Sequence, residues 1–235
     1  MASKRFEKAT ALVDRNAEQS LDQAVSVLKG FPPAKFNETV QLSVSLTIDP
    51  KKSDQIVRGT VTLPHGTGKT RRVIVFCKSE NERLAREAGA DAVGAAELIQ
   101  RVQDGWMEFD VAVATPDLMR DVSRLGKLLG PRGLMPNPKA GTVTDDVVKA
   151  INEVKQGKVE FKMDKLSNIH FVVGKLSFKP QQLVENSQTA LDAIIRSRPS
   201  SVKGRMIKRV VLSSTMSPGI PVKTDGLEAG LAQNE

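Results

Sequence analysis

The chain has 235 residues, a formal net charge of +8 and a pI near 9.6. This length suffices for two domains that each bury a core, and the basic balance favours a polyanionic partner, most simply a nucleic acid, over an acidic small substrate. No apolar run approaches the roughly 18 residues of a membrane-spanning helix, and the N-terminal segment lacks the apolar core of a signal peptide. We therefore expect a soluble intracellular protein without a membrane partner, although an anionic membrane surface is the competing partner for a basic chain.

Cysteine and aromatic content narrow the class further. Cys77 is the only cysteine, so an internal disulfide is excluded, and its place after the apolar run Val73–Phe76 predicts a buried small hydrophobe. The chain has eight Phe, one Trp and no Tyr. Proteins that grip single strands usually stack bases on aromatic side chains, so this deficit favours structured RNA or a duplex recognised through sugar and phosphate.

The first third of the chain predicts a helix followed by two strands. Ser20 and Gln23 form a capping box, which predicts a helix from about Leu21 to Lys29. From Thr39 to Ile48 apolar and polar residues alternate, which is typical of a half-buried strand, and Val57 to Leu63 indicates a second strand. We expect these two strands to form an antiparallel pair.

The segment His65–Thr70 places glycines before a Lys-Thr pair, as phosphate-binding loops do. The motif requires a glycine five residues before Gly68, where this chain has Leu63. It also requires a helix afterwards, whereas the strand-like Arg71–Phe76 follows. We therefore predict a basic linker here rather than a nucleotide site.

The middle of the chain alternates short apolar strands with helices. Strands are predicted at Val73–Phe76, Ala92–Val93 and Val111–Ala114. Helices are predicted from a capping box at Ser79 to Gly89, over Ala95–Val102, from Pro116 to about Leu125, and over Asp145–Lys155 with Thr144 as the cap. This pattern indicates a parallel sheet covered on both faces, as in a Rossmann-like unit. No GxGxxG follows a strand, so a dinucleotide site has little support.

The segment Leu129 to Thr144, LGPRGLMPNPKAGTVT, contains three glycines and three prolines, so neither a helix nor a central strand can run through it. Its few charges, Arg132 and Lys139, are both positive, and its backbone amides could face an anion. By its composition it is a surface loop between two helices. The alternative is a site at which an α/β enzyme binds a nucleotide or a small phosphorylated ligand.

Past Gly157 the alternating pattern returns. Two strands, Val159–Met163 and Ile169–Val173, flank a turn, and a helix over Pro180–Arg196 and a strand over Arg205–Ser214 follow. The antiparallel style of both ends predicts α/β and α+β architecture in two domains. One is a discontinuous outer α+β domain with an antiparallel sheet, residues 1–66 and 158–235, and the other is an inserted Rossmann-like α/β domain, residues 67–157.

Charge is distributed unevenly over these segments. Residues 1–66, 67–157 and 158–235 carry net charges of +2, +1 and +5. Because the two ends together hold +7 of the +8, the polyanion is expected to bind the outer domain.

Groups suited to catalysis or metal binding are scarce. His65 and His170 are the only histidines, and neither has a metal-ligand partner at a recognisable spacing. The pair Asp145-Asp146 is typical of a first helical turn, where acids stabilise the helix dipole. No GxSxG elbow is present. We predict no catalytic residue, no metal site and no cofactor.

The Gly/Pro loop resembles the signature of a ribosomal protein family. The sequence GPRGLMPNPKAGTV is similar to that of the bacterial large-subunit ribosomal protein L one family, the protein of the mobile stalk beside the exit site for transfer RNA. The similarity extends, in order, to Ile48–Lys69, Asp104–Asp117 and the Thr215-Met216 pair. It implies a structural constituent of the large subunit that is cytoplasmic, ribosome-associated and monomeric within the ribosome. It further implies three partners: large-subunit ribosomal RNA, transfer RNA leaving the exit site, and the messenger of its own operon, which it represses.

The resemblance also implies where RNA binds. Lys35, Phe36 and Thr39 match the family's entry to its first strand. In physical terms Lys35 could neutralise a phosphate, Phe36 could pack on a ribose or base, and Thr39 could bond a 2′-hydroxyl. Without the resemblance, Phe36 would be interpreted as an ordinary core aromatic.

Further RNA contacts are implied near the end of the chain. Thr215, Met216 and Ser217 match a Thr-Met-Gly of the family, and Ser217 departs from its usual glycine, so a β-carbon there is expected to cost affinity where backbone approaches RNA. His170 and Arg209 are further candidate contacts. The turn before His170 also departs from the family's form, and by itself this histidine is an ordinary surface residue.

Overall fold

The structure of the protein is a computed structural model, and it describes residues 3–14, 17–202 and 204–224. Contacts between Cα atoms divide the chain into two compact units. The first, which we call the discontinuous unit, comprises residues 1–68 and 159–235, and the second, the middle unit, comprises residues 69–158.

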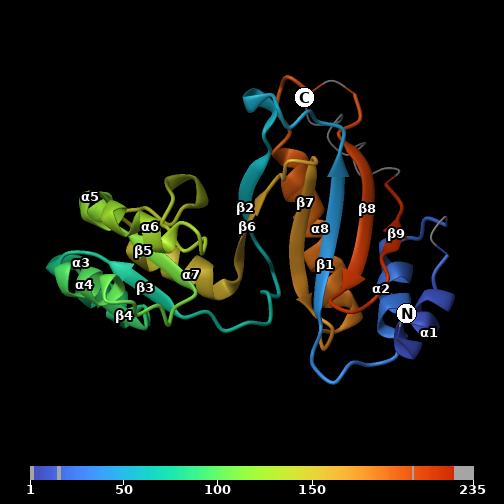
Figure 1. Cartoon of the computed structure of the whole chain (residues 1–235), viewed down its shortest axis with the longest axis horizontal. Helices are drawn as coiled ribbons and strands as arrows, with labels where there is room; N and C mark the ends of the chain where they lie inside the picture. Colours follow the sequence, from blue (N-terminus) through green and yellow to red (C-terminus); the bar gives the residue numbers. More distant parts are fainter. Residues whose placement is uncertain (1–2, 15–16, 203, 225–235) are drawn as a thin grey trace. The chain divides into compact units, whose positions relative to one another are not determined.

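A four-stranded antiparallel sheet forms the centre of the discontinuous unit (Figure 1). Its strand order is β7-β1-β8-β9, with β1 at Thr39–Leu46, β7 at Asn168–Lys175, β8 at Ile207–Ser214 and β9 at Ile220–Val222. The first strand of the chain therefore pairs on both sides with strands from its other end.

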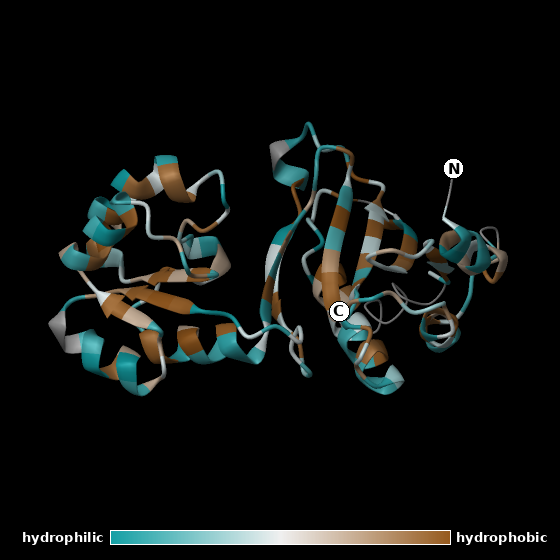
Figure 2. Cartoon of the chain, turned by 60° about the horizontal axis from the view of Figure 1, so that its bottom comes forward, coloured by the Kyte–Doolittle hydropathy of each residue, from teal (hydrophilic) through white to brown (hydrophobic). Residues whose placement is uncertain are grey.

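The sheet has one buried and one polar face. Along β1 buried and half-exposed residues alternate strictly, as the sequence pattern predicts, and the strands are banded brown and teal in Figure 2. The core beneath the sheet includes residues of α2 (Leu21–Lys29), α8 (Pro180–Arg196) and α1 (Lys4–Ala11). The predicted capping box of α2 is confirmed, because Ser20 and Gln23 each accept a hydrogen bond from the other's N–H.

The strand β2 does not pair with β1. It spans Arg58–Thr62, follows a short 3-10 turn at Ser53–Gln55, and forms a separate two-stranded sheet with β6 at Lys158–Lys162. The expected β1–β2 pair is therefore wrong. Both edges of β1 are occupied by β7 and β8, and these long-range pairings bury the apolar face along the whole strand.

The middle unit is built on a three-stranded parallel sheet of order β4-β3-β5. The strands are β3 at Val73–Phe76, β4 at Ala92–Gly94 and β5 at Val111–Ala114. Helices α3 (Ser79–Glu87) and α7 (Val147–Gln156) contribute to the core on one face, and α4 (Ala96–Gln103) to the core on the other. The parallel sheet with cover on both faces is thus confirmed.

Cys77 follows the strand β3, whose apolar side chains are buried on both faces of the sheet. Val73 and Val75 contribute to the core with α3 and α7, and Ile74 and Phe76 to the opposite core. Burial of Cys77 raises the pKa of its thiol to about 11, so it behaves as the small hydrophobe predicted.

Three predicted helices differ in detail. The helix α3 begins at Ser79 and has Lys78 as its N-cap, so the predicted capping box at Ser79 is wrong. The helix expected from Pro116 to Leu125 is a series of short turns: 3-10 at Pro116–Leu118, α5 at Met119–Val122, 3-10 at Ser123–Leu125 and α6 at Gly126–Leu129. The N-cap of α7 is Asp146 rather than Thr144, because the Asp146 carboxylate accepts from the Lys149 N–H at 3.0 Å. Among the helices described, none has the length and apolar character needed to cross a membrane.

Candidate nucleic-acid interface

Two large apolar side chains are exposed where β1 begins and β8 ends. Phe36 precedes β1 and is 54% exposed, and Met216 follows β8 and is 52% exposed. Lys35 beside them is exposed as well. The interpretation of Phe36 as a core aromatic is therefore wrong, and its ring is accessible to a partner.

A buried carboxylate holds these two ends together. Glu38 is 2% exposed, and it accepts a hydrogen bond from the Ser214 hydroxyl at 2.5 Å and from the Met216 N–H at 3.0 Å. The Arg5 guanidinium supplies a third donor at 3.2 Å. A buried charge with a cationic partner and two further donors is well satisfied, so this cluster fixes the turn after β8 against the segment before β1.

Thr39 and Thr215 form a second connection between the same strands. The Thr39 N–H donates to the Thr215 hydroxyl oxygen at 3.1 Å, and this hydroxyl lies 3.4 Å from the Thr39 carbonyl, to which it donates. The Lys175 ammonium donates to the Thr39 hydroxyl at 2.8 Å. A hydroxyl that accepts one bond still carries a proton to donate, which suits recognition of a ribose or phosphate oxygen.

Ser217 closes the turn that carries Met216. Its hydroxyl accepts from the Ser214 N–H at 2.8 Å, and its own N–H donates to the Ser214 carbonyl at 3.2 Å. Among the described non-glycine residues only Ser167 has a positive φ. Serine therefore occupies this position without backbone strain, and its side chain has a structural bond.

His170 lies on β7 and Arg209 on β8, the two strands that flank β1. His170 is opposite Ser43, and Arg209 is opposite Ser45. The Nδ1 of His170 lies 3.1 Å from the Gln41 amide nitrogen and from the Ser43 hydroxyl. The half-exposed residues of β1 that connect them with the Phe36 end are Thr39, Gln41, Ser43 and Ser45.

The structure thus places the eight predicted residues on β1, on its two neighbouring strands and in the segments before β1 and after β8. Six gather where β1 begins and β8 ends: Lys35, Phe36, Thr39, Thr215, Met216 and Ser217. The partners of His170 and Arg209 lie four and six residues further along β1, about 13 and 20 Å away at the usual rise of a strand.

Sequence reasoning did not single out Glu38, Arg5 or Lys175. A signal for Glu38 exists, because the alternation of β1 puts it in phase with the buried Val40 and Leu42 and so predicts a buried carboxylate. Nothing in the local sequence marks Arg5 or Lys175 as members of this cluster.

The Gly/Pro loop of the middle unit has a different arrangement. The Asn137 carbonyl accepts from the amides of Ala140 and Thr142, and its side chain accepts from the Lys139 N–H at 2.9 Å. The loop is attached to β5 by bonds between Ala114 and both Thr142 and Thr144. These amides are already bonded within the chain, so they do not form a cradle for an anion.

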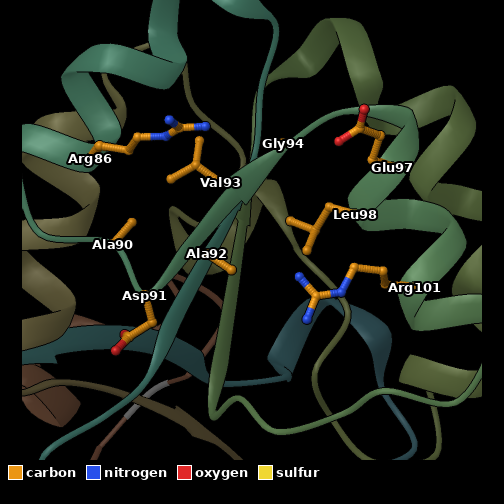
Figure 3. Close-up of a pocket in the computed structure, with 9 residues that line it drawn as sticks. All are labelled: Arg86, Ala90, Asp91, Ala92, Val93, Gly94, Glu97, Leu98 and Arg101. Atoms are coloured by element: carbon orange, nitrogen blue, oxygen red, sulfur yellow. The ribbon is translucent and has the colours of Figure 1, made fainter.

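A pocket of about 340 Å³ lies beside β4 in the same unit (Figure 3). Its charged lining is balanced, with Arg86 and Arg101 against Asp91 and Glu97. The guanidinium carbon of Arg101 lies 4.5 Å from the centroid of the Trp106 ring. Within the described part of the chain, moreover, no three His, Cys, Asp or Glu side chains gather as metal ligands. This pocket therefore lacks the excess of positive charge that a phosphorylated ligand needs.

Comparison with known proteins identifies the family. Residues 28–218 match the Ribosomal protein L1p/L10e family. The chain is 55% identical to the large ribosomal subunit protein uL1 of Streptomyces avermitilis, over 95% of this chain and 92% of that protein. It is 53% identical to the protein of that name from Kosmotoga olearia, over 93% and 94%, and 52% identical to that of Acidothermus cellulolyticus, over 98% and 96%.

The chain belongs to this ribosomal protein family. It is accordingly a structural, non-enzymatic protein of the large ribosomal subunit, associated with the ribosome in the cytoplasm. The resemblance seen in the sequence is confirmed, and the alternative of an α/β enzyme with a phosphate site is set aside.

Proposed function

We propose that the protein binds a folded segment of large-subunit ribosomal RNA directly, through the polar face of its antiparallel sheet and the cluster around Phe36 and Met216. The discontinuous unit would then be the RNA-binding domain, with the middle unit inserted into it. The observation that carries this proposal is that Phe36 and Met216 are both exposed at one end of a hydroxyl-rich strand, where Glu38 accepts from the Met216 N–H.

The chemistry of this face suits RNA better than a protein partner. Ser43, Ser45 and Thr39 offer hydroxyls, and Gln41 offers an amide, which can bond 2′-hydroxyls and phosphate oxygens. Lys35 and Arg209 supply positive charge at the two ends of the row. Residues 1–66 and 158–235 carry +7 of the net +8, so counterion release would favour binding there.

The remaining functions follow from the same surface. A messenger leader that mimics the ribosomal site would bind the same residues, so excess protein would repress translation of its own operon. Membership of the family further supports a role in the mobile stalk, where the protein would move with transfer RNA as it leaves the exit site.

Filter binding with a large-subunit ribosomal RNA fragment tests the proposal. Phe36→Ala should weaken binding by about 10- to 100-fold, because a base or ribose stacked on an aromatic side chain contributes roughly 1–3 kcal/mol. The unfolding midpoint should change little, because the ring is more than half exposed. Leu84→Ala removes a similarly exposed apolar side chain, 47% exposed, from the middle unit and should leave RNA binding unchanged.

The proposal would be contradicted if the wild-type protein bound this fragment no more tightly than an unrelated structured RNA of equal length at the same salt concentration. Unchanged affinity in Phe36→Ala would move the site away from this end of the sheet.

A further inference from the structure

The N-terminal helix contributes one side chain to the RNA-binding cluster. Arg5 is in the first turn of α1, and one terminal nitrogen of its guanidinium donates to the Pro32 carbonyl at 3.1 Å and to the Glu38 carboxylate at 3.2 Å. The other terminal nitrogen donates to the Met216 carbonyl at 2.6 Å. The side chain is 26% exposed.

These contacts join two segments that are far apart in the sequence. Pro32 and Glu38 lie on the two sides of Phe36, and Met216 lies in the turn after β8. The peptide groups of Met216 are held from two directions, because its N–H donates to Glu38 and its carbonyl accepts from Arg5. A planar guanidinium carries five donors in a fixed geometry and can make such a connection, whereas an ammonium is a point charge on a flexible stem.

We propose that Arg5 is a positioning residue for RNA binding: it holds the Phe36 segment and the Met216 turn in the arrangement that receives RNA. The proposal rests on the proposed function of this cluster and adds α1 to the binding site. Three of the five guanidinium N–H donors contact protein acceptors and the side chain is mostly covered, so we assign Arg5 a role through Glu38 and Met216, and the salt dependence below tests this against a phosphate contact. Binding is tighter when the bound geometry is preorganised, so loss of this side chain reduces affinity without removal of an RNA contact.

The test measures affinity of the intact protein for a large-subunit ribosomal RNA fragment at several salt concentrations. Arg5→Met should weaken binding about tenfold, because the buried Glu38 loses its cationic partner and the Met216 turn loses a bond. The slope of log affinity against log salt should stay as in wild type, because no phosphate contact is lost. Lys8→Met is the control, because it removes the same charge from an exposed position of α1 and should stay within about twofold of wild type.

Two further measurements separate positioning from general stability. In free Arg5→Met the Met216 amide should exchange its hydrogen faster than in wild type, while the amides of β1 keep their protection. Arg5→Lys keeps the positive charge beside Glu38 and is expected to fold, and its affinity should fall between those of wild type and Arg5→Met.

Any one of three results would overturn the inference. The first is an affinity of Arg5→Met within about twofold of wild type, and the second is unchanged hydrogen exchange of the Met216 amide in this variant. The third is a salt slope of Arg5→Met reduced by about one, because that would indicate a direct phosphate contact. Wild-type binding with an unaffected Arg5→Met overturns this inference alone. Absence of wild-type binding overturns the proposed function as well.

Discussion

Ser217 lies in the turn after β8, and its hydroxyl accepts from the Ser214 amide at 2.8 Å. Its half-buried side chain lies against its own turn. The side chain thus supports the turn that presents Met216, and a β-carbon at this position needs no left-handed backbone.

We therefore predict that Ser217→Ala lowers the free energy of unfolding by about 1 kcal/mol, because the Ser214 N–H loses its side-chain acceptor. Ser217→Val should lose the same bond and also weaken RNA binding through added bulk. Urea denaturation and filter binding measure the two effects, with the exposed Ser201→Ala as control. Full stability of Ser217→Ala would show that the Ser214 amide needs no side-chain acceptor.

Asp164 organises the turn between β6 and β7. Its carboxylate accepts from the amides of Leu166 at 2.8 Å and Asn168 at 2.7 Å. The hydrogen bond from the Asn168 backbone N–H is the main reason that the pKa of Asp164 lies below its ordinary value of 3.8. The nearby His170 lowers this pKa further. A carboxyl group whose pKa is lowered on folding stabilises the fold above pH 3.8, and this stabilisation is lost as the pH falls through the folded value.

The thermal midpoint of wild type should accordingly exceed that of Asp164→Asn at pH 5, and the difference should shrink at pH 3, because asparagine does not titrate. Calorimetric scans at the two pH values measure the difference. A gap that is constant or wider at pH 3 would remove Asp164 from the acid-sensitive groups.

At the scale of single residues, exposure of the site could not be predicted from the pattern alone. Phe36 lies three residues before β1, where the chain bends, so the alternation of the strand does not extend to it, and its large apolar side chain suggested the core. Glu38 was within reach of the pattern, because a carboxylate in phase with buried residues requires partners. Arg5 was not, because its contacts with Pro32 and Met216 join residues that only the folded chain brings together.

The secondary-structure elements show where local signals succeed and fail. Strong periodicity, together with the capping box of α2, predicted β1, α2, α7 and α8 to within about two residues, the usual uncertainty of helix and strand ends. The helix α1 was missed because only Ala9 of its residues is buried, so its pattern is mostly polar. The strand β9 was missed because it has three residues and contains Pro221.

Pairing between strands was the least predictable feature. Neighbours in sequence often pair, which favoured a β1–β2 hairpin, but the strands that match β1 along its whole length are β7 and β8. A pairing across more than a hundred residues has no local signal, because it depends on which apolar faces can share one core.

A side chain of α8 bonds to the chain where it leaves the discontinuous unit for the first time. Asn186 is fully buried, and its side chain accepts from the His65 N–H at 3.1 Å. It also donates to the carbonyls of Gly66 at 3.0 Å and Val173 at 2.7 Å. One amide thus satisfies three backbone groups where the chain leaves the discontinuous unit.

Asn186→Ala should lower the free energy of unfolding by about 2–4 kcal/mol, because it leaves these backbone groups without partners and opens a small cavity. Gln188→Ala, an exposed amide on the same helix, should change it by less than about 0.5 kcal/mol. Denaturant unfolding of both variants gives the comparison. A loss for Asn186→Ala as small as that of the control would mean that water replaces its bonds.

At the scale of the whole molecule, the sequence shows where strands with apolar and polar residues in alternation give way to a segment in which strands and helices follow one another. It also shows where the first pattern returns after Gly157. The uneven charge was visible as well. Composition and pattern could not identify the ribosomal role, because neither a basic sheet nor a parallel α/β unit specifies a partner. That inference depended on the resemblance of the Gly/Pro loop, which belongs to the middle unit and is not part of the proposed interface.

We propose that the discontinuous unit alone recognises the RNA. A deletion variant in which a short Gly/Ser linker joins Gly66 to Lys158 retains all eight predicted contacts and +7 of the net charge. We predict that it folds, because chain ends at domain boundaries commonly lie close together. It should bind the ribosomal RNA fragment nearly as tightly as the intact protein and with a similar salt slope, because the same phosphates are neutralised. The isolated middle unit should fold and bind weakly. A folded deletion variant that has lost most of its affinity, together with a middle unit that retains it, would contradict the claim and place the RNA site on the other unit.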